Sequence, residues 1–221
     1  NIHRAIGRDG RYEPGRILRV AQELNADIIA LQEADFPRQD HAPIAPWLAQ
    51  KTGMIAIGGP VWSREGVGYG NALLSRYPVD RVRRWDLSVG RHEPRGALDV
   101  ELTICGRTVH VLNTHLGLWP RERPQQADRL LELLSLSRRD LTILMGDLNE
   151  WRVGGKSLRG LRRVFGSPAA PVTFPARWPV LALDRIWIFP AQALLTVEAH
   201  DTPRSRLASD HLPVKADIYL P

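Results

Sequence analysis

The spacing of apolar residues changes several times along the chain and predicts alternating helices and strands. After Pro14-Gly15, apolar residues recur at helical spacing up to Asn25: Ile17, Leu18, Ala21 and Leu24. Similar spacing predicts a second long helix over residues 124–137 and shorter helices over 47–51 and 157–165. Short, mostly apolar runs predict strands over the following ranges: 27–33, 54–57, 71–75, 81–87, 97–104, 109–114, 141–147, 183–188, 194–198 and 214–219.

The proportion of strands to helices sets the expected fold class. About nine strands with few helices exceed one doubly wound sheet, and the chain mixes hairpin-like with helix-separated strands. We therefore expect an α+β fold in which two mixed β-sheets pack together with helices outside. No internal repeat and no tract rich in Pro, Gly and Ser divides the 221 residues, so we expect one domain over residues 1–221.

Cysteine content, hydropathy and charge narrow the class of protein and of partner. The single cysteine, Cys105, excludes an internal disulfide, and we expect it in the core. No apolar run reaches the ~20 residues of a membrane span and no signal peptide is visible, so a monomer in the cytoplasm is favoured. The net charge of +6 favours nucleic acid, acidic lipid headgroups or a phosphorylated metabolite, with a merely basic surface as an equal alternative.

Oxygen-bearing side chains collect where predicted strands end. Glu33 ends "IIALQE", and Asp147 and Asn149 stand two positions apart in "GDLNE". Since alternate residues of a strand share a face, we expect Asp147 and Asn149 side by side. Oxygen ligands without a cysteine cluster suit Mg²⁺, Mn²⁺ or Ca²⁺ better than zinc. For any one of these motifs alone, a polar residue that merely meets solvent is the commoner explanation.

Two histidine motifs strengthen the functional interpretation. "NTHLG" places His115 after Asn113, and "SDHLPV" places His211 after Asp210, each beside a predicted strand. Histidine exchanges protons near neutral pH, and Asp184 in "ALDRIWI" is placed to orient one of the rings. The other histidines lack such a motif, and His110 is interpreted as a strand residue at a layer boundary: His3, His41, His92, His110 and His200. The glycines of "REGVGYGN" are interpreted as a flexible loop, since no lysine and helix follow them: Gly66, Gly68 and Gly70.

In this order, the motifs resemble the endonuclease/exonuclease/phosphatase superfamily. The resemblance rests on "NIH", "LQE", "GNALLSRYP", "EPRGAL", "NTHLG", "GDLNE", "LDRIW" and "SDHLPV", and covers nearly the whole chain. It implies a four-layer α/β/β/α sandwich and cleavage of a phosphoester by water with the help of Mg²⁺, or of Mn²⁺ or Ca²⁺. One departure lies at the amino end, because the family's first strand precedes the asparagine that matches Asn1 and is absent here.

The resemblance also implies a role for each matching residue. It makes Glu33 the principal metal ligand, with Asn1 and Asp210 near the same metal. It implies that Asp147 orients or deprotonates the attacking water, and that Asn149 donates its amide to a phosphoryl oxygen. His211, held by Asp184, would contact the phosphate or take a proton, and His115 would face the leaving oxygen. The predicted substrate-binding residues are Asn113, Arg95 and Trp151. A surface ion pair is an equal alternative for Arg95, and packing of a loop onto the sandwich is the alternative for Trp151.

The substrate stays open between DNA or RNA, a phospholipid headgroup and a small soluble phosphoester. A metal-dependent phosphodiesterase is the favoured function, and a catalytically weak member that binds nucleic acid or membrane is the alternative. Beyond "GDLNE", a segment rich in cations predicts a basic rim on a helix whose apolar side faces the core: Trp151, Arg152, Lys156, Arg159, Arg162 and Arg163.

Overall fold

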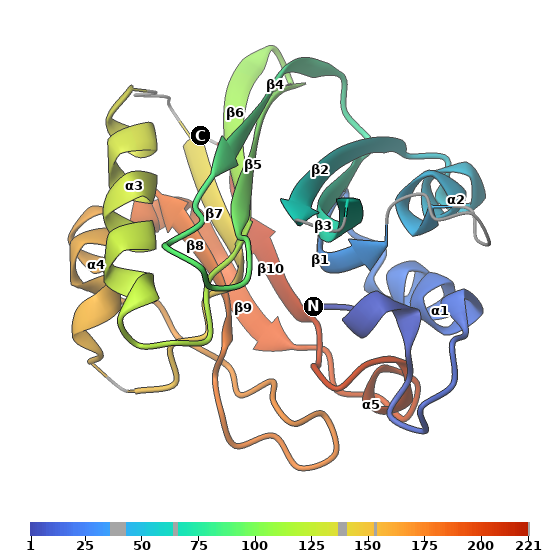
Figure 1. Ribbon diagram of the computed structural model, residues 1–221. Helices are drawn as coiled ribbons and strands as arrows, with labels where there is room; N and C mark the ends of the chain where they lie inside the picture. Colours follow the sequence, from blue (N-terminus) through green and yellow to red (C-terminus); the bar gives the residue numbers. More distant parts are fainter. Residues whose placement is uncertain (36–42, 64–65, 137–140, 153, 221) are drawn as a thin grey trace.

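A computed structural model describes residues 1–35, 43–63, 66–136, 141–152 and 154–220 (Figure 1). Along these residues the elements follow in this order: η1 His3–Ala5, α1 Pro14–Leu24, β1 Ile28–Asp35, α2 Ile44–Thr52, β2 Ile55–Ser63, β3 Gly66–Ser75, β4 Val79–Asp86, β5 Gly96–Ile104, β6 Arg107–His115, α3 Glu122–Leu136, β7 Leu141–Asp147, η2 Lys156–Leu158, α4 Arg159–Phe165, β8 Asp184–Phe189, η3 Ala191–Ala193, β9 Leu194–Ala199, α5 Ser205–Ala208 and β10 Val214–Ile218. Each helix and strand expected from the apolar pattern is present, with shifted ends.

The elements stack in four layers, which confirms the expected sandwich. One sheet has the strand order β4-β5-β6-β7-β8, and another has the order β1-β3-β2. Apolar residues fill the space between these sheets, and β9 and β10 contribute to the same core. Helices α1 and α2 pack on the outer face of the small sheet, and α3 and α4 on the outer face of the large one (Figure 1).

Strand pairing brings three strand ends to one edge of the large sheet. Strands β6 and β7 are parallel, and their last residues, His115 and Asp147, are paired across the sheet. Strand β8 runs antiparallel to β7 and begins opposite Asp147 with Asp184. The other pairs in the large sheet are antiparallel, and so are all described pairs of the small sheet. The large sheet is therefore mixed as expected, whereas the three-stranded sheet is not.

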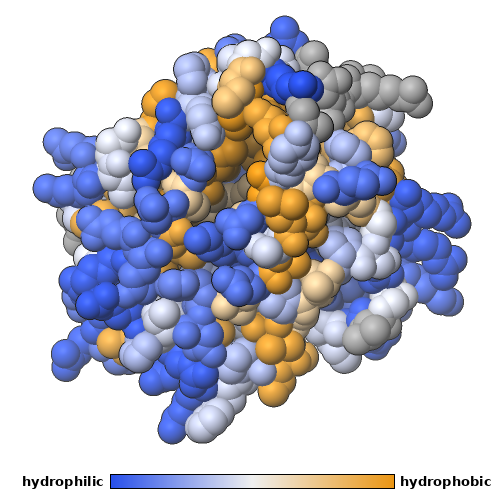
Figure 2. All heavy atoms as spheres, turned by 180° about the vertical axis from the view of Figure 1, so that it is seen from behind, coloured by the Kyte–Doolittle hydropathy of each residue, from blue (hydrophilic) through white to orange (hydrophobic). Residues whose placement is uncertain are grey.

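A cavity separates the small sheet from the β9-β10 pair. It has a volume of about 440 Å³ and is bordered by β1 on one side and β10 on the other, with Asn1 and Ile2 at one end. Among the described strands, β1 and β10 each stand at the edge of their own sheet and pair with no strand across this cavity. The surface seen from behind is hollowed among apolar side chains (Figure 2). The cavity therefore lies between two free strand edges.

Helix α1 shows how local chemistry fixes an element and its buried face. Pro14 stands at the first turn, where its missing N–H costs no hydrogen bond. Asn25 ends the helix in the left-handed conformation and donates its backbone N–H to Ala21. The buried residues between them are three or four positions apart: Ile17, Val20, Ala21 and Leu24. The predicted helix is confirmed, with Val20 buried on its core face and the expected Leu18 only partly buried.

Two sequence expectations about turns are wrong. Cys105 is exposed, because Cys105 and Gly106 form the hairpin turn between β5 and β6, with φ of 49° and 74°. Positive φ at both positions is the geometry that suits a two-residue turn to twisted strands. Gly66 to Gly70 belong to β3 and pair with β2, so they are not a flexible loop. A side chain at Gly70 would collide with the backbone of Gly59 and Pro60.

Within the described residues, each helix is too short or too polar to cross a bilayer.

Candidate functional site

The candidate site lies at the edge where β6, β7 and β8 meet. His115, Asp147 and Asp184 are all nearly buried, and each stands at a strand end in neighbouring register. The loops that leave this edge are bonded to one another, because Leu116 donates its N–H to the Asp147 carbonyl and Leu148 donates to Leu183. The hydrogen-bond ladder of the sheet thus holds three titratable groups close together.

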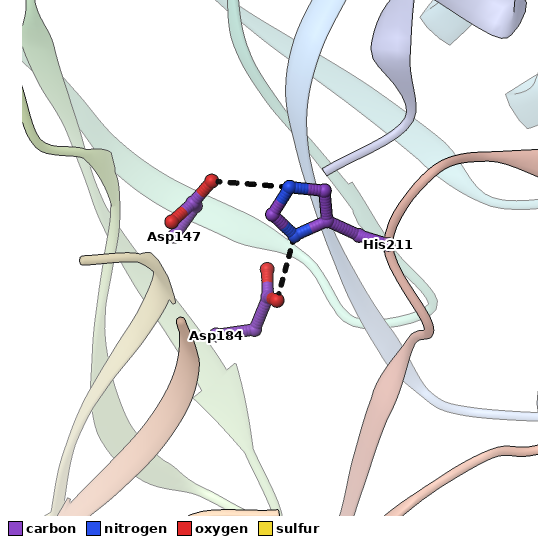
Figure 3. Close-up of side chains that lie close together, drawn as sticks. All are labelled: Asp147, Asp184 and His211. Atoms are coloured by element: carbon purple, nitrogen blue, oxygen red, sulfur yellow. Dashed lines mark hydrogen bonds and ion pairs between the residues drawn. The ribbon is translucent and has the colours of Figure 1, made fainter. Parts of the chain in front are cut away.

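His211 lies between two aspartates and carries the clearest geometry of the site (Figure 3). Its Nδ1 is 2.8 Å from Asp184 Oδ2, and its Nε2 is 3.8 Å from Asp147 Oδ2. Thr173 donates to the same Asp184 oxygen at 2.5 Å, and the Phe174 ring lies 4.9 Å from the imidazole, centroid to centroid. The ring is therefore fixed in place, as expected for a histidine oriented by a carboxylate.

A second cluster joins the amino end of the chain to Glu33. The Asn1 side-chain amide donates to Glu33 Oε1 at 2.9 Å and to Asp147 Oδ2 at 3.2 Å. Two carboxylates from different sheets thus converge on one nitrogen. Glu33 does not end its strand as expected, because β1 continues to Asp35 past a bulge after Leu31. Glu33 has φ of 54° there, and such a conformation is strained for a residue with a side chain.

Asn149 comes close to Asp147 in a way that the strand pattern did not predict. Strand β7 ends at Asp147, and Asn149 lies in the following loop with φ of 50°. Its backbone N–H donates to Asp147 Oδ1 at 3.0 Å. The expectation that both residues share one face of a strand is therefore wrong. A tight turn, closed by the aspartate itself, places the two side chains together.

The hydrogen bonds of Asn149 define the proton position on His115. The Asn149 amide nitrogen lies 2.9 Å from the Leu116 carbonyl and 3.1 Å from His115 Nε2. An amide nitrogen only donates, so Nε2 accepts and a neutral ring carries its proton on Nδ1. This assignment agrees with burial, which lowers the pKa of His115 more than the Asp147 charge raises it.

The two site histidines are shifted in opposite directions. Burial lowers the pKa of His211, but the hydrogen bond and charge of Asp184 and the charge of Asp147 outweigh it, so the net shift is upward. Burial raises the pKa of Asp184, yet the amino-terminal charge and His211 bring that pKa down to about 2. Burial also raises the pKa of Glu33, but the hydrogen bond from the Asn1 amide and nearby positive charges outweigh it, so the net shift is downward. The site thus favours a charged His211, a neutral His115 and ionised Glu33 and Asp184 side chains.

Of the remaining residues predicted from the sequence, Asn113 lies inside the core and Asp210 lies next to His211. Asn113 is fully buried between the sheets, where it accepts from Gln32 and donates to the Leu31 and Ala72 carbonyls. It therefore joins the two sheets and does not face solvent. Asp210 is half-buried beside the site and accepts from Ser209, and its role as a metal ligand stays a prediction.

Arg95 contacts the loop after His115, and Trp151 lies in the loop after Asp147. Arg95 is buried and donates to the Leu116 carbonyl at 3.3 Å and to Glu93 at 2.7 Å. Trp151 is half exposed, and the Arg152 guanidinium lies 5.2 Å from its ring centroid. The apolar side of the segment behind it faces the core as expected, through Leu158, Leu161 and Phe165. His41 lies outside the described residues.

Sequence reasoning missed several residues that hold the site together. Gln32 accepts from the Asn1 amino group at 2.9 Å and donates to Asn113, so it joins the amino end to both sheets. Its position next to Glu33 in the "LQE" motif could have identified Gln32 as a residue near the site. Thr173 and Phe174 hold Asp184 and His211 but belong to an irregular segment without a motif. Their roles follow only from the fold.

The donor set of the site fits a hard divalent cation. Two groupings are present: Asp147, Asp184 and His211, whose ligand atoms lie within 4.8 Å of one another, and the pair of carboxylates that meet at Asn1. In the first grouping, Asp184 Oδ2 already accepts from Thr173 and contacts His211. In the second grouping, carboxylate oxygens of Glu33 and Asp147 converge from two sheets on the Asn1 amide nitrogen.

Comparison with known proteins decides the family. Residues 1–211 match the model of the endonuclease/exonuclease/phosphatase family. The chain is 30% identical to YbhP of Escherichia coli (strain K12), over 100% of this chain and 94% of the relative. The same figures describe YbhP of Shigella flexneri. The chain belongs to the endonuclease/exonuclease/phosphatase family. Members of this family are phosphoester hydrolases that generally use a divalent metal, as the sequence motifs implied.

Solved structures agree with the fold. A family protein from Leptotrichia buccalis superposes with a TM-score of 0.79 at 14% identity, covering 100% of this chain and 97% of that one. A family protein from Beutenbergia cavernae gives 0.78 at 23% identity, covering 100% and 70%. The mannosyl-6-phosphatase Bt3783 of Bacteroides thetaiotaomicron gives 0.74 at 18% identity, covering 94% and 90%. At these identities the likeness concerns the fold.

Proposed function

We propose that the protein is a divalent-metal-dependent phosphodiesterase that uses water as the nucleophile. The observation that carries the proposal is the convergence of Glu33, Asp147 and the His211-Asp184 pair at one sheet edge. Three carboxylates beside a fixed imidazole are what a phosphoester hydrolase needs to bind a cation and to move a proton.

The cation would be held by Glu33 and Asp147, with the Asn1 side chain beside them and Asp210 as a further predicted ligand. When bound, it would neutralise charge on the phosphoryl oxygens and lower the pKa of a water. Carboxylate and amide oxygens suit Mg²⁺ or Mn²⁺, and Ca²⁺ fits the same donors.

The chain's own residues would orient the other reactants. Asp147 orients the attacking water or takes its proton, since its two oxygens face Asn1, Asn149 and both histidines. His211 is held by Asp184 with a raised pKa, and a charged ring there favours a phosphoryl oxygen. Asp184 acts through His211 and is a positioning residue.

Asn149 and His115 would change partners when substrate enters. Both amide hydrogens of Asn149 are engaged, one by Leu116 and one by His115 Nε2. A phosphoryl oxygen can therefore take an Asn149 hydrogen only by replacing one of these two partners. Replacement of His115 would free its ring to face the leaving oxygen, the position that the family resemblance implies for it. Arg95 and Trp151 lie near enough to the edge to contact longer substrates.

A phosphatase acting on a small soluble phosphoester is the second candidate. The family includes at least one relative described as a sugar phosphatase, the Bacteroides thetaiotaomicron protein above. A catalytically weak binding protein is disfavoured because every motif residue with a proposed catalytic role is present: Glu33, His115, Asp147, Asn149, Asp184 and His211.

The first prediction concerns the metal and the two carboxylates. Metal-stripped protein is expected to hydrolyse bis(p-nitrophenyl) phosphate only after Mg²⁺ or Mn²⁺ is added. Glu33→Gln and Asp147→Asn are each expected to lower kcat/KM by at least ~10³-fold, because each removes a cation ligand or the group that orients water. Circular dichroism would show whether both variants stay folded.

Glu198→Gln is the matched control, because Glu198 is an exposed carboxylate on β9. Full activity of the wild type in EDTA would contradict the proposed mechanism. Faster hydrolysis of p-nitrophenyl phosphate than of the diester would favour the phosphatase.

A further inference from the structure

Of the loops that leave the large sheet at the same edge as the site, three adjoin the strand ends that carry His115, Asp147 and Asp184. The first, residues 116–121, follows His115, and the second, residues 148–155, follows Asp147. The third, residues 166–183, ends at Asp184, which pairs with Asp147. We call them the site-edge loops. Because β6 and β7 are parallel and β8 is antiparallel to β7, all three connect to the sheet beside the reacting groups.

Each site-edge loop presents a tryptophan to solvent. The exposed fractions are 63% for Trp119, 51% for Trp151 and 68% for Trp178. Aliphatic side chains are exposed on two of the same loops: Leu118 at 63%, Val172 at 43% and Val180 at 69%. Single exposed apolar residues are common on proteins, but a group of them around a site marks an interaction surface.

The charges on these loops have one sign. Four exposed cations lie on the loops or border them: Arg121, Arg152, Lys156 and Arg177. The adjoining acidic residues are buried, with Glu122 1% and Glu150 3% exposed. Both carboxylates accept backbone hydrogen bonds within the loops: Glu122 accepts from the Trp119 N–H, and Glu150 accepts from the Arg152 N–H. The described surface of these three loops therefore shows positive charge and apolar groups, with no exposed carboxylate. On the neighbouring β4–β5 loop, the exposed Glu93 carboxylate accepts from Arg95 at 2.7 Å.

The loop that carries Leu118 and Trp119 is held in place from below. The buried Arg123 guanidinium donates to the Leu118 carbonyl at 2.7 Å and to the Gly117 carbonyl at 3.3 Å. Gln126 accepts from the Gly117 N–H at 2.8 Å. The exposed side chains thus project from a fixed backbone, so binding through them would require little ordering of the loop.

The combination of exposed tryptophans, aliphatic side chains and cations distinguishes between two anionic partners, single-stranded nucleic acid and a membrane surface. Tryptophan stacks on an unpaired base and also favours a membrane interface. Leu118, Val172 and Val180 have no flat face to stack and gain only by entering an apolar medium. Apolar side chains among cations, without exposed acids, match the surface of an anionic bilayer.

We propose that the site-edge loops dock the protein on an anionic phospholipid bilayer. The docked protein would hold the site against the headgroup layer, where phosphodiester linkages are concentrated. This consequence rests on the proposed phosphodiesterase, whereas the docking itself does not. The substrate class then becomes a phospholipid headgroup or another phosphoester at the membrane surface.

The test is co-sedimentation with vesicles in EDTA, so that hydrolysis plays no part. Wild-type protein is expected to bind vesicles of phosphatidylcholine mixed with phosphatidylglycerol, to bind phosphatidylcholine alone more weakly, and to lose binding as salt rises. Trp119→Ser with Trp178→Ser is expected to weaken partition by about tenfold or more through lost apolar contact. Arg121→Glu with Arg177→Glu is expected to abolish the preference for phosphatidylglycerol.

The control is Leu195→Ser with Tyr219→Ser. These side chains are 63% and 60% exposed, but they lie at the end of the β9-β10 pair away from His211. Equal partition of the wild type and the tryptophan variant would overturn the proposal. So would loss of single-stranded oligonucleotide binding in that variant with vesicle binding unchanged, which would assign the loops to nucleic acid.

Failure of docking and failure of the proposed function give different results. Glu33→Gln protein is expected to bind vesicles like the wild type, because Glu33 lies outside the loops. Diester hydrolysis without vesicle binding would support the proposed phosphodiesterase and contradict membrane docking. Vesicle binding without any metal-dependent hydrolysis would support docking and contradict the proposed phosphodiesterase.

Discussion

At the scale of single residues, strained backbone and site chemistry coincide. Glu33 and Asn149 both have positive φ, and both make hydrogen bonds to site residues. Such conformations persist only where surrounding contacts determine them. At Glu33 the bulge of β1 turns the carboxylate toward Asn1, and at Asn149 the aspartate-closed turn aims the amide at His115. At both positions, the unusual backbone conformation thus points a side chain toward the other site residues.

The pairing of Asp184 with His211 leads to a prediction about turnover. Asp184→Asn is expected to lower kcat by about 10²-fold or more with little change in KM, because an amide cannot stabilise the charged ring. His211→Ala is expected to be at least as slow. If Asp184 acts through His211, the double variant should be no slower than His211→Ala alone.

Asp217→Asn is the matched control for this series. Asp217 accepts from Thr196 at 2.8 Å on the exposed face of the β9-β10 pair, so its loss leaves the imidazole untouched. Additive losses in the double variant would contradict the positioning role of Asp184.

At the scale of elements, a polar cluster lies buried on the outer face of the large sheet. His110 on β6 lies with its Nε2 2.6 Å from Asp99 Oδ1 on β5, and Trp85 on β4 donates to the other carboxylate oxygen at 3.0 Å. His110 is fully buried there, on the same side of β6 as Leu112 under α3. Its interpretation as a strand residue is confirmed, and its partner was not expected from the sequence.

Removing the Asp99 charge is expected to destabilise the fold in a pH-dependent way. Burial raises the pKa of Asp99, but His110, Trp85 and Arg83 outweigh it, so the pKa lies below the ordinary value of 3.8. The stability from ionised Asp99 is therefore fully present above 3.8 and is lost as pH falls through the lower, folded value. Asp99→Asn should lower the free energy of unfolding by about 3 kcal/mol near neutral pH.

Urea unfolding at several pH values measures this effect. The gap between wild type and Asp99→Asn should shrink in acid. Asp80→Asn provides the comparison, because Asp80 accepts from Thr103 in the same two strands but is exposed. Its cost should stay within about 0.5 kcal/mol. A gap for Asp99→Asn that is unchanged or widens as pH falls would refute the linkage.

At the scale of the whole molecule, the cavity between β1 and β10 interrupts one layer of the sandwich. Ile2 donates its N–H to the Gln32 carbonyl, so the chain enters this cavity beside the carboxyl end of β1. Strand β10 begins just after His211 and runs away from the site. An extended segment joined to Asn1 would lie parallel to β1 and antiparallel to β10. It would satisfy both free edges and unite β2-β3-β1 with β10-β9 in one mixed sheet.

A designed strand added before Asn1 is therefore expected to stabilise the protein. A short extension of alternating valine and threonine should raise the melting midpoint by about 2–4 °C for each kcal/mol gained, through edge hydrogen bonds and burial. An extension of equal length made of glycine and serine should have little effect. Hydrogen exchange should slow at the amides of Ile28–Gln32 and of β10 only in the first protein. Equal melting midpoints for the two extensions would contradict this use of the cavity.

The sequence by itself determined the order of elements, the core faces of the helices and the identity of the chemical groups. Apolar spacing recovers α1 and three of its four buried residues, Ile17, Ala21 and Leu24, because a helix must place one stripe against the core. Motifs point to Asp147, Asp184 and His211 because each stands at or beside a strand end, and these ends meet at one edge of the large sheet. Glu33 was also singled out, although it lies inside β1 of the other sheet.

Only the tertiary structure decided how these groups face one another. The pairing of His110 with Asp99, the holding of Asp184 by Thr173 and the converging of Glu33 and Asp147 on Asn1 join residues far apart in the chain. Local pattern encodes which side of an element is apolar, since that depends on near neighbours. It does not encode partners across sheets or the turn that redirects Asn149, because those depend on sheet register and packing, which form only when the whole chain folds.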